Sequence, residues 1–377
     1  MKLTDVVDRI NGNVDRFNTD LEYYIGGEHF ESNELEVTNR GILKENLGKL
    51  GFKFRFAFQD RDVVFMARNP HLRKAGMVRF SGLCSDASYI LRSKDESKIT
   101  QEYLAVMLQS NHFWDYCESH KVGSVNFANN WSSIANYEFD LPSIEKQKEI
   151  SNKVWAAYRL KQAYKKLLAA TDEMVKSQFI EMYHKTHNTQ TLESVCAIIS
   201  KGITPKYVDF SSVAVVNQAC IQWDGQHLEN IKYHNEEIPL KKRTLQTGDV
   251  LLNATGTGTL GRCCVFNCPS NDNIYINDGH VIALATDKSI LLPEVLNAYL
   301  SLNDTQAEIY RLYVTGSTNQ VDIVFSDIKK MKVPVPNIDD QISFVKILNQ
   351  ADKSKSYVRI ALKNLESILG YCIRQVA

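Results

Sequence analysis

The 377-residue sequence has no excess of charge, because 44 basic residues are balanced by 44 acidic ones. No large basic field therefore indicates a protein that grips nucleic acid alone, although a protein that does so inside a complex is not excluded. Apolar runs near the roughly 20 residues of a membrane-spanning helix are also missing. The start, Met-Lys-Leu-Thr-Asp, has no signal-peptide pattern. We expect a cytoplasmic protein with reduced thiols and no membrane contact.

The eight cysteines lack the spacing of a metal site. Cys263, Cys264 and Cys268, with His280, form the nearest candidate set. Zinc ligands usually come as two pairs two to four residues apart, and adjacent cysteines on a strand point to opposite faces. We interpret these cysteines as core thiols and expect no metal. The histidines His29, His112, His184 and His234 have no Ser or Cys partner at a diagnostic spacing, so we expect packing or surface roles for them.

Motifs of catalysis and cofactor binding are missing as well. A DNA adenine methyltransferase needs Asn/Asp-Pro-Pro-aromatic, and the nearest match is Asn69-Pro70-His71, with one proline and no aromatic residue. The segment 253–262 is glycine-rich after a predicted strand, but it lacks the Lys-Ser/Thr of a P-loop and no clear helix follows. We interpret it as a tight loop whose backbone amides and Arg262 could bind a phosphate. We expect no cofactor and no catalytic residue.

The sequence does contain an internal repeat. Gly-Ser-Val-Asn at residue 123 and Gly-Ser-Thr-Asn at residue 316 are each followed by an apolar stretch, a proline, acidic residues, a glutamine and a long helical segment. The offset is 193 at the Gly-Ser pair and 194 at Pro142 and Pro336, close to half the chain. Two tandem copies of one unit suit a two-part ligand better than a single catalytic cleft.

Further anchors in the same order support the duplication. Tyr24 to Phe30 aligns with Val215 to Ile221, and Asp62-Val-Val aligns with Asp249-Val-Leu. Asp86 to Ile90 and Glu102-Tyr-Leu align with the segments 192 residues later. The drift between anchors is only a few residues, which indicates a true repeat.

Each copy begins with short strand-type runs and continues into helices, so the predicted fold class is α/β (α+β). Phe52 to Phe58 alternates apolar and polar residues, and 249–253, 263–266 and 280–284 are short β-type runs. One helix is expected at 100–116 and another at 292–313. A long amphipathic helix ends each copy. Its stripe in the first copy is Ile150, Val154, Ala157, Lys161, Tyr164, Leu168, Thr171 and Val175. Its stripe in the second copy is Ile342, Val345, Leu348, Tyr357, Ala361, Leu365, Ile368 and Cys372.

The narrow stripes predict that the two long helices pair with each other as an antiparallel coiled coil. At 1.5 Å per residue, helices of this length extend roughly 50–60 Å. Because the first helix leads from one copy to the other, the returning helix would form a spacer with a domain at either end, related by a pseudo-twofold axis. Such a rigid spacer would act as a ruler, and two modules on a ruler select DNA half-sites at a set separation.

This arrangement resembles the specificity (S) subunit of type I restriction-modification systems, on the Gly-Ser-Thr-Asn-Gln segment at 316–320, the run 332–341 and Lys201-Gly-Ile-Thr-Pro-Lys. The resemblance implies target-recognition domains at 1–142 and 188–336, and conserved spacer helices at 143–187 and 337–377. It implies that each domain reads half of a bipartite site in double-stranded DNA, and that two methyltransferase (M) subunits dock on the helices. Restriction (R) subunits would join through them, and the chain itself would be non-catalytic.

Candidate DNA contacts are the polar and basic residues of predicted loops. Arg suits guanine, Asn and Gln suit adenine, and Lys or Thr suit phosphates. The first copy offers Arg68, His71, Arg73, Lys74, Ser124, Asn126 and Asn129. The second copy offers Lys201, Thr204, Lys206, Thr255, Thr257, Arg262, Ser317, Asn319 and Gln320. Each of these is equally open to interpretation as a solvated loop residue.

Local charge predicts where the affinity for DNA comes from. Residues 143–185 contain nine basic and five acidic residues, whereas residues 190–334 contain twelve basic and fifteen acidic ones. A net acidic second domain contributes little to phosphate binding, so we expect weak DNA binding by the isolated chain and tight binding within a complex. Two other hypotheses stay open from sequence: a fused or stand-alone restriction or methylation enzyme, and a duplicated protein-interaction scaffold.

Overall fold

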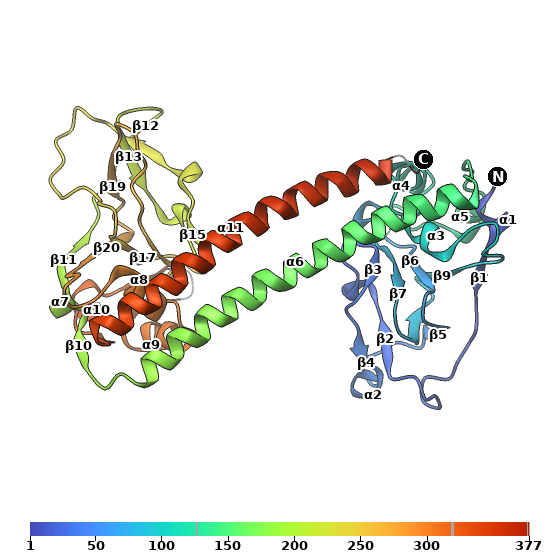
Figure 1. Ribbon diagram of the computed structural model, residues 1–377, viewed down its shortest axis with the longest axis horizontal. Helices are drawn as coiled ribbons and strands as arrows, with labels where there is room; N and C mark the ends of the chain where they lie inside the picture. The colour runs from blue at the N-terminus through green and yellow to red at the C-terminus, as the bar shows by residue number, and fades with distance from the viewer. Residues whose placement is uncertain (126, 318–319, 375, 377) are drawn as a thin grey trace. The chain divides into compact units, whose positions relative to one another are not determined.

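The computed structural model describes residues 1–125, 127–317, 320–374 and 376. The chain divides into two compact units, one made of residues 1–167 and 357–377 and the other of residues 168–356 (Figure 1). Each unit combines β-sheets with short helices and with segments of the two long helices. A search of the described residues finds no helix with the length and apolarity needed to span a bilayer.

The first unit contains two sheets. One has the order β1-β9-β6-β7-β3, formed by Val7–Ile10, Ser88–Ser93, Val63–Met66, Ala75–Val78 and Glu36–Val37. The other has the order β4-β2-β8-β5, formed by Gly41–Ile42, Tyr23–Ile25, Gly82–Ser85 and Phe54–Phe58. Strand β5 is shorter than the run predicted from Phe52, because Phe52 itself is exposed.

The second unit contains two four-stranded sheets. One has the order β11-β20-β17-β18, formed by Cys196–Lys201, Val281–Thr286, Val250–Asn253 and Cys263–Val265. The other has the order β12-β16-β13-β19, formed by Tyr207–Val208, Lys232–His234, Val213–Val216 and Ile274–Asn277. Three strand pairs complete the unit: β10 with β23 (Thr189–Thr191, Lys332–Pro334), β14 with β15 (Ile221–Gln222, Gly225–Gln226) and β21 with β22 (Val314–Ser317, Gln320–Ile323).

The sheets show that the two units are copies. The order β1-β9-β6-β7 matches β11-β20-β17-β18, with antiparallel pairing throughout. Strand β2 runs parallel to β8 just as β13 runs parallel to β19. The copies differ at the sheet edges, where β5 extends the second sheet of the first unit beside β8 and β12 extends its counterpart beside β16. The internal repeat predicted from sequence is therefore a repeat of structure.

Short helices cover the sheets. The first unit has α1 (Leu3–Val6), α2 (Leu43–Asn46), α3 (Gln101–Met107), α4 (Asn111–Ser119), α5 (Trp131–Ala135) and the 3₁₀ turns η1 (Gly27–His29) and η2 (Pro70–Leu72). The second has α7 (Leu192–Val195), α8 (Pro293–Leu300), α9 (Asn303–Leu312), α10 (Phe325–Ile328), η3 (Gln218–Cys220) and η4 (Leu228–Asn230).

The prediction of one helix at 100–116 and one at 292–313 was wrong, because each segment forms two helices. Ser110 has an extended backbone and its hydroxyl accepts a hydrogen bond from the Phe113 amide, which starts α4 as a new helix. Leu302 has the same extended conformation before α9. The break lets both helices of a pair lie against their sheet.

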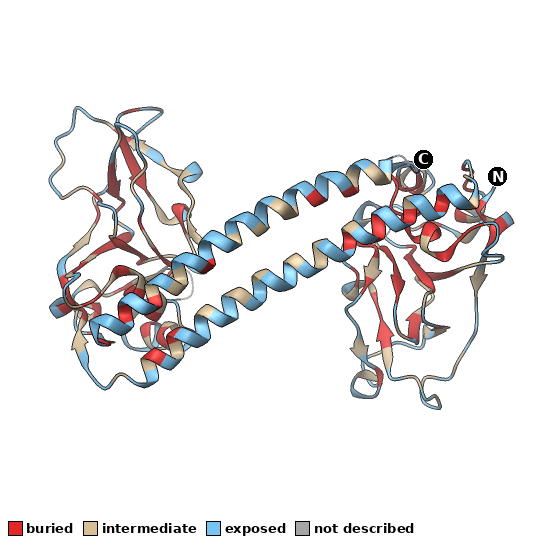
Figure 2. Ribbon diagram, in the orientation of Figure 1, coloured by how far each residue is buried: buried red, intermediate tan, exposed pale blue. Residues whose placement is uncertain are grey.

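Buried residues lie along the strands and on the neighbouring helices in each unit (Figure 2). In the first unit, Phe65 of β6 packs with Phe113 and Trp114 of α4 at ring-centroid distances of 5.6 Å. In the second unit, Val250 and Leu252 of β17 share a core with Val295 and Leu296 of α8. These cores fix the strand ends from which the candidate loops emerge.

The two long helices are α6 (Ile144–His184) and α11 (Ile338–Arg374). All eight positions of the predicted stripe on α6 are buried or partly buried. The stripe predicted on α11 was partly wrong, since Ile342, Tyr357 and Ile368 are exposed. Leu365 of the stripe is buried as predicted, and Phe344, Ala351 and Leu369 are buried on the same side of the helix.

The helices run antiparallel. Within the second unit, the Phe179 and Phe344 rings lie 5.3 Å apart, and Lys355 Nζ lies 2.9 Å from Asp172 Oδ1. Moving forward along α11 therefore means moving backward along α6. Within the first unit, Leu369 of α11 joins the core that contains Val154 and Tyr158 of α6.

A buried glutamine fastens each long helix to its unit. Gln147 accepts a hydrogen bond from the Thr100 amide at 3.1 Å and donates to the carbonyls of Lys98 and Pro142 at 2.7 and 2.9 Å. Gln341 does the same in the second unit, with the Leu292 amide at 2.8 Å and the carbonyls of Ile290 and Pro336 at 2.9 and 2.8 Å. The repeated glutamine of the sequence is thus a repeated hydrogen-bond clasp.

A buried ion pair also recurs. Asp62, at the turn into β6, accepts hydrogen bonds from Arg92 Nε and Nη2 at 2.7 and 2.9 Å. Asp249, at the turn into β17, accepts two from Arg243 at 2.8 and 2.9 Å. The bidentate geometry compensates the burial of each carboxylate. It also explains why the Asp-Val anchor occurs in both copies.

A second buried carboxylate, Glu34, ties the first unit to α6. Its Oε1 lies 2.8 Å from Lys161 Nζ and 3.3 Å from Lys165 Nζ, and Gln162 Nε2 donates to its Oε2 at 3.0 Å. Burial by itself would raise the pKa of Glu34, but the hydrogen bonds and charges of Lys161 and Lys165 outweigh it and lower the pKa. The ionised carboxylate therefore stabilises the folded unit.

We expect this stabilisation to disappear in acid. A lowered folded-state pKa means that the contribution of Glu34 is complete above the ordinary carboxyl value of 4.5 and is lost as the pH falls through the lower folded value. Glu34→Gln should lower the free energy of unfolding near neutral pH by about 1–3 kcal/mol, and the difference from wild type should shrink below pH 4.5. Urea unfolding across pH measures both, with exposed Glu31→Gln as the control. A constant difference across pH would contradict the assignment.

Candidate nucleic-acid interface

In the first unit, two predicted contact segments that are distant in sequence lie side by side. The loop after β6, residues 67–74, forms a bridge between Arg68 and Ala128. The Asn69 amide donates to the Phe127 carbonyl at 2.8 Å, and Val122 bridges Ala128. The Arg68 loop and the Gly-Ser loop therefore form one surface at the end of β6.

The second unit builds the same pair of loops. The loop after β17, residues 254–262, bridges the β21–β22 hairpin at Thr255 and Asp322. The Ile323 amide donates to the Ala254 carbonyl at 2.7 Å. Because β17 is the counterpart of β6, the loop that follows the strand pairs with a second candidate segment at the same place in both copies of the repeat.

Individual candidates of the first unit differ in exposure. Arg68, His71 and Ser124 are exposed at this surface. Arg73 and Lys74 are turned toward the protein, with Arg73 Nη1 donating to Asn111 Oδ1 at 2.7 Å and Lys74 Nζ to the Gly27 carbonyl at 2.6 Å.

Two further candidates of the first unit do not offer a side chain at this surface. Asn129 is only 1% exposed and donates to the Cys117 carbonyl, so it supports the loop from inside. Its prediction as an exposed loop contact was wrong in that respect, because burial in the core leaves the amide out of reach of a ligand. Asn126 lies outside the described residues.

In the second unit Thr204, Lys206 and Thr257 are exposed. Lys201 Nζ lies 3.2 Å from Asp322 Oδ2. Thr255 Oγ1 accepts from Gln218 Nε2 at 2.5 Å and lies 3.0 Å from His280 Nδ1.

The remaining candidates of the second unit belong to the loop and the hairpin. Arg262 donates to Gln222 Oε1 at 2.6 Å and to the Gly258 carbonyl at 2.8 Å. Ser317 and Gln320 belong to β21 and β22, and Asn319 lies outside the described residues.

The two loops use different residues at the positions where the backbone has a positive φ angle. In the second unit Gly256, Gly258 and Gly261 have φ of 96°, 83° and 85°. In the first unit Asn69 and Arg73 have φ of 53° and 48°, which costs energy for residues with a Cβ. The first loop therefore holds strained backbone beside Arg68 and His71.

The glycine-rich segment leads into strand β18 and not into a helix, so it is a tight loop as predicted. Cys263 and Cys264 face opposite cores, as expected for neighbours on a strand. Burial raises the pKa of both thiols to about 12. Over the described part of the chain, no group of three or more His, Cys, Asp or Glu side chains is placed to hold a metal ion.

Some residues that shape the interface were not among the predicted contacts. Asp322 meets both Lys201 and Thr255, and Gln218 holds the Thr255 loop from β13's end. Gly202 is required because a Cβ there would lie 2.0 Å from the Asn277 carbonyl oxygen. Each contact joins segments dozens of residues apart, which local patterns do not reveal.

Comparison with known proteins identifies this architecture. Residues 1–168 match the family model described as the type I restriction modification DNA specificity domain. The type I restriction-modification S subunit of M. genitalium matches over 100% of this chain and 95% of its own length, with 10% identity and a TM-score of 0.61. A chain from a structure titled as the basis of complex assembly and conformational transition of the type I R-M system matches over 100% and 96%, with 16% identity and a TM-score of 0.58. No curated protein matches the chain.

The first 168 residues thus match the specificity-domain family, and the whole chain shares the fold of that S subunit.

Proposed function

We propose that each unit reads one half of a bipartite site in double-stranded DNA through its paired loops. One observation supports this proposal most strongly. Strands β6 and β17 are equivalent in the repeat, and the loop after each of them pairs with a second candidate segment. Residues 1–142 and 188–336 would be the two target-recognition domains. Segments 143–187 and 337–377 would be the spacer helices that set the gap between half-sites. Such a subunit works in the cytoplasm.

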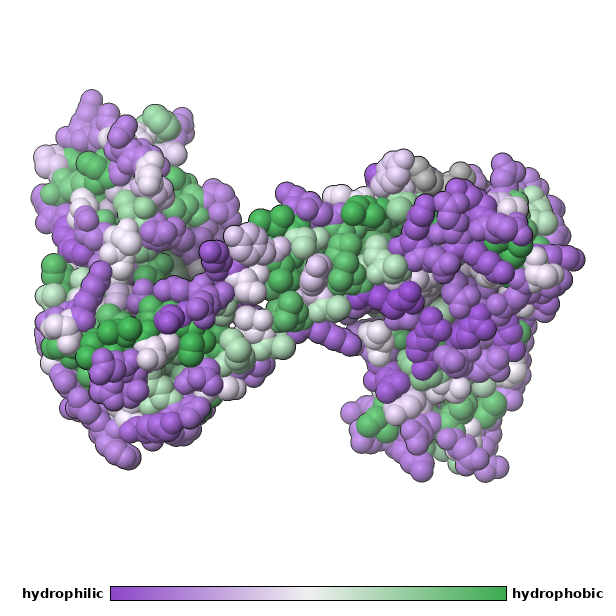
Figure 3. Space-filling model, viewed as in Figure 1, coloured by the Kyte–Doolittle hydropathy of each residue, from purple (hydrophilic) through white to green (hydrophobic). Residues whose placement is uncertain are grey.

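We also propose that two methyltransferase subunits dock on the long helices and that restriction subunits join through them. Tyr357, Ile360, Ile368 and Tyr371 of α11 are at least half exposed. At 100° per residue they fall on one side of the helix, which is where a partner would bury them. Figure 3 shows hydrophobic residues gathered along the long helices. The absence of excess charge fits a reader whose DNA affinity comes partly from partners.

Co-expression with the methyltransferase encoded beside this chain tests the proposal. Single-molecule sequencing should reveal methylated adenines in a gapped two-part motif, and that motif should vanish when this chain is left out. Methylation that persists unchanged without the chain would contradict the role. Methylation by the chain alone would favour the enzyme hypothesis instead.

The exposed guanidinium of Arg68 is expected to contribute to affinity or base choice in the first half-site. Arg68→Ala should weaken binding of the assembled complex to its methylated motif by about tenfold, as expected for one lost Arg contact to base or phosphate. Fluorescence anisotropy with a labelled duplex measures the change. Arg55→Ala removes the same charge from the exposed side of β5 and should leave binding unchanged. Equal losses in both variants would assign the effect to overall charge.

A further inference from the structure

A hydrogen-bonded histidine stands at the paired loops of the second unit. His280 directly precedes strand β20, and it is exposed. Its Nδ1 lies 3.0 Å from Thr255 Oγ1 in the loop after β17. In the sequence His280 stood out only as a possible metal ligand beside the cysteines, whereas the structure places it among the candidate DNA contacts.

The neighbours of Thr255 determine which ring nitrogen of His280 carries the proton. Gln218 Nε2 donates to the Thr255 carbonyl and to Thr255 Oγ1, both at 2.5 Å. Only the amide nitrogen of Gln218 fits beside a carbonyl oxygen, so the Thr255 hydroxyl receives one hydrogen bond and keeps its own hydrogen to donate. Among the described residues, His280 Nδ1 is the acceptor within reach of that hydrogen. The neutral ring therefore carries its proton on Nε2, which becomes an N–H donor.

The backbone of His280 is fixed as well. Its amide donates to Asp278 Oδ1 at 2.6 Å, and its carbonyl accepts from the Ala254 amide at 2.8 Å. Asp278 is only 6% exposed, and its other carboxylate oxygen accepts from the Tyr207 hydroxyl at 3.2 Å. Because the ring and the backbone are both held before a ligand arrives, little entropy is lost when this donor binds an acceptor.

The free donor of His280 suits an uncharged acceptor. Nε2 lies on the opposite side of the ring from the Thr255 contact and has no hydrogen-bond partner within the described part of the chain. Asp322 bridges Thr255 from the β21–β22 hairpin, and its carboxylate pairs with Lys201. A carboxylate beside the loop disfavours a second anion such as a phosphate, whereas the acceptors on the edge of a base carry no charge.

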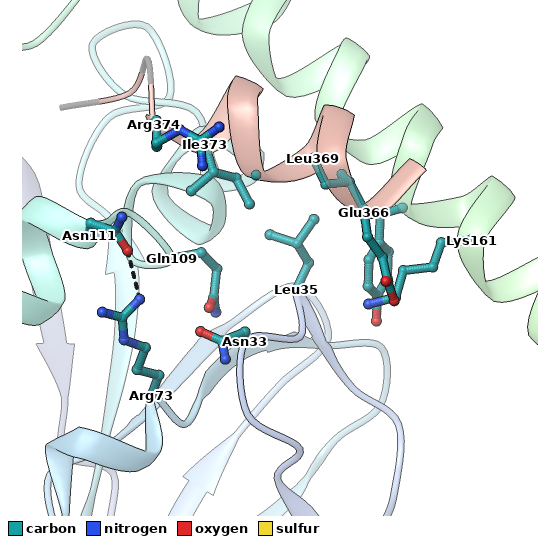
Figure 4. A pocket seen from close by; sticks show the side chains of 12 residues that line it. Asn33, Leu35, Arg73, Gln109, Asn111, Lys161, Glu366, Leu369, Ile373 and Arg374 are labelled. Carbon is teal, nitrogen blue, oxygen red and sulfur yellow. Dashed lines mark hydrogen bonds between the residues drawn. The ribbon is translucent and has the colours of Figure 1, made fainter. Parts of the chain in front are cut away.

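The equivalent position of the first unit offers no such donor. Ser88 corresponds to His280 in the repeat, since each stands two residues after the anchor aspartate. Ser88 is only 4% exposed, and its hydroxyl donates to Met66 Sδ at 3.0 Å. Arg73, in the loop after β6, is also turned to a protein partner, Asn111 (Figure 4). His280 is thus a feature of the second unit alone, as a residue must be if it distinguishes one half-site from the other.

We propose that His280 Nε2 donates a hydrogen bond to the N7 atom of a purine in the half-site that the second unit reads. N7 is the acceptor that adenine and guanine both present in the major groove. This role rests on the proposed function, and it adds a specificity-determining residue that was not among the predicted contacts. Thr255, Gln218 and Asp278 act through His280 as positioning residues.

Methylation mapping with the co-expressed methyltransferase tests the residue. His280→Ala should leave the first half-site and the gap unchanged and should relax one position of the second half-site. Fluorescence anisotropy of the assembled complex should show about tenfold weaker binding to the wild-type motif, as expected for one lost base contact. His187→Ala is the matched control, because it removes an exposed histidine of the same unit outside the paired loops, and it should change neither the motif nor the affinity.

Duplexes that contain 7-deazapurines identify the atom that His280 contacts. In these bases a C–H group replaces N7, so the base pairs normally but lacks the acceptor. Substitution at one purine of the second half-site should weaken binding of the wild-type complex about tenfold and should have little further effect on His280→Ala, as a double-mutant cycle requires for two groups in contact. The wild-type measurement stands by itself if the variant folds poorly.

Three results would contradict the role of His280. A uniform loss of affinity with an unchanged motif and a weaker salt dependence would assign His280→Ala to a phosphate contact. Binding of the wild-type complex that is insensitive to every 7-deazapurine of the second half-site would exclude the N7 contact. An intact wild-type motif that His280→Ala leaves unchanged would overturn this role alone, whereas the lack of any gapped motif with the wild-type chain would overturn the proposed function together with it.

Discussion

Gln341→Ala is expected to lower the free energy of unfolding by about 3–5 kcal/mol, because three backbone groups lose their hydrogen-bond partners together. The buried Gln341 side chain accepts a hydrogen bond from the Leu292 amide and donates hydrogen bonds to the Ile290 and Pro336 carbonyls, all at 2.8–2.9 Å. Alanine has no polar side chain, so the three backbone groups would be left without hydrogen-bond partners beside a cavity. Gln147→Ala should cost about as much in the first unit, where the same clasp recurs.

Gln350→Ala is the matched control, since it makes the same substitution at an exposed position of the same helix. Urea unfolding followed by circular dichroism should show a large shift of the midpoint for Gln341→Ala and almost none for Gln350→Ala. Similar small shifts in both would mean that water replaces the clasp without cost. The junction between recognition domain and helix would then have another origin.

Lengthening both long helices by four residues is expected to change the gap of the DNA motif and not its two halves. Four residues add about 6 Å of helix, which corresponds to one or two base pairs of DNA at roughly 3.4 Å per pair. Insertions at matched positions of α6 and α11 keep the antiparallel contact in register, as the Asp172–Lys355 pair requires. Methylation mapping reads the gap directly.

Insertion into α6 alone provides the control, because it shifts one helix past the other and should abolish methylation. An unchanged gap in the double insertion would contradict the ruler. Altered half-site bases would show instead that the helices influence the recognition loops.

Much of the fold could be predicted from the sequence because the repeat constrains it twice. The Asp-Val anchor marked a turn into a strand, and the glutamine after each proline marked the start of a long helix. Helix boundaries were less accessible, since the Ser110 cap that divides α3 from α4 looks like any polar residue within a helical pattern.

The stripe on α11 failed for a different physical reason. Apolar residues on this helix occupy more than one side: Leu365 and Leu369 are buried, whereas Tyr357 and Ile368 are exposed. The exposed side of this helix has the same apolar composition as its buried side. Periodicity alone therefore could not choose the buried side.

The candidate interface shows the limit of local patterns. Arg68 and His71 were found by composition, and the structure places both on an exposed loop. The pairing of that loop with Ala128, and of Thr255 with Asp322, joins residues 60 and 67 positions apart. The inward turn of Arg73 and Lys74 also depends on partners from other segments. Composition selects residue types, whereas the fold decides which of them reach the surface.

Exchange of one recognition domain tests the central claim most directly. Residues 1–142 would be replaced by the corresponding domain of another specificity subunit, and methylated adenines would be mapped across the genome after co-expression with the methyltransferase. Two independent readers on one spacer predict that one half of the motif changes while the other half and the gap stay the same. A motif that changes in both halves, or in neither, would contradict the account.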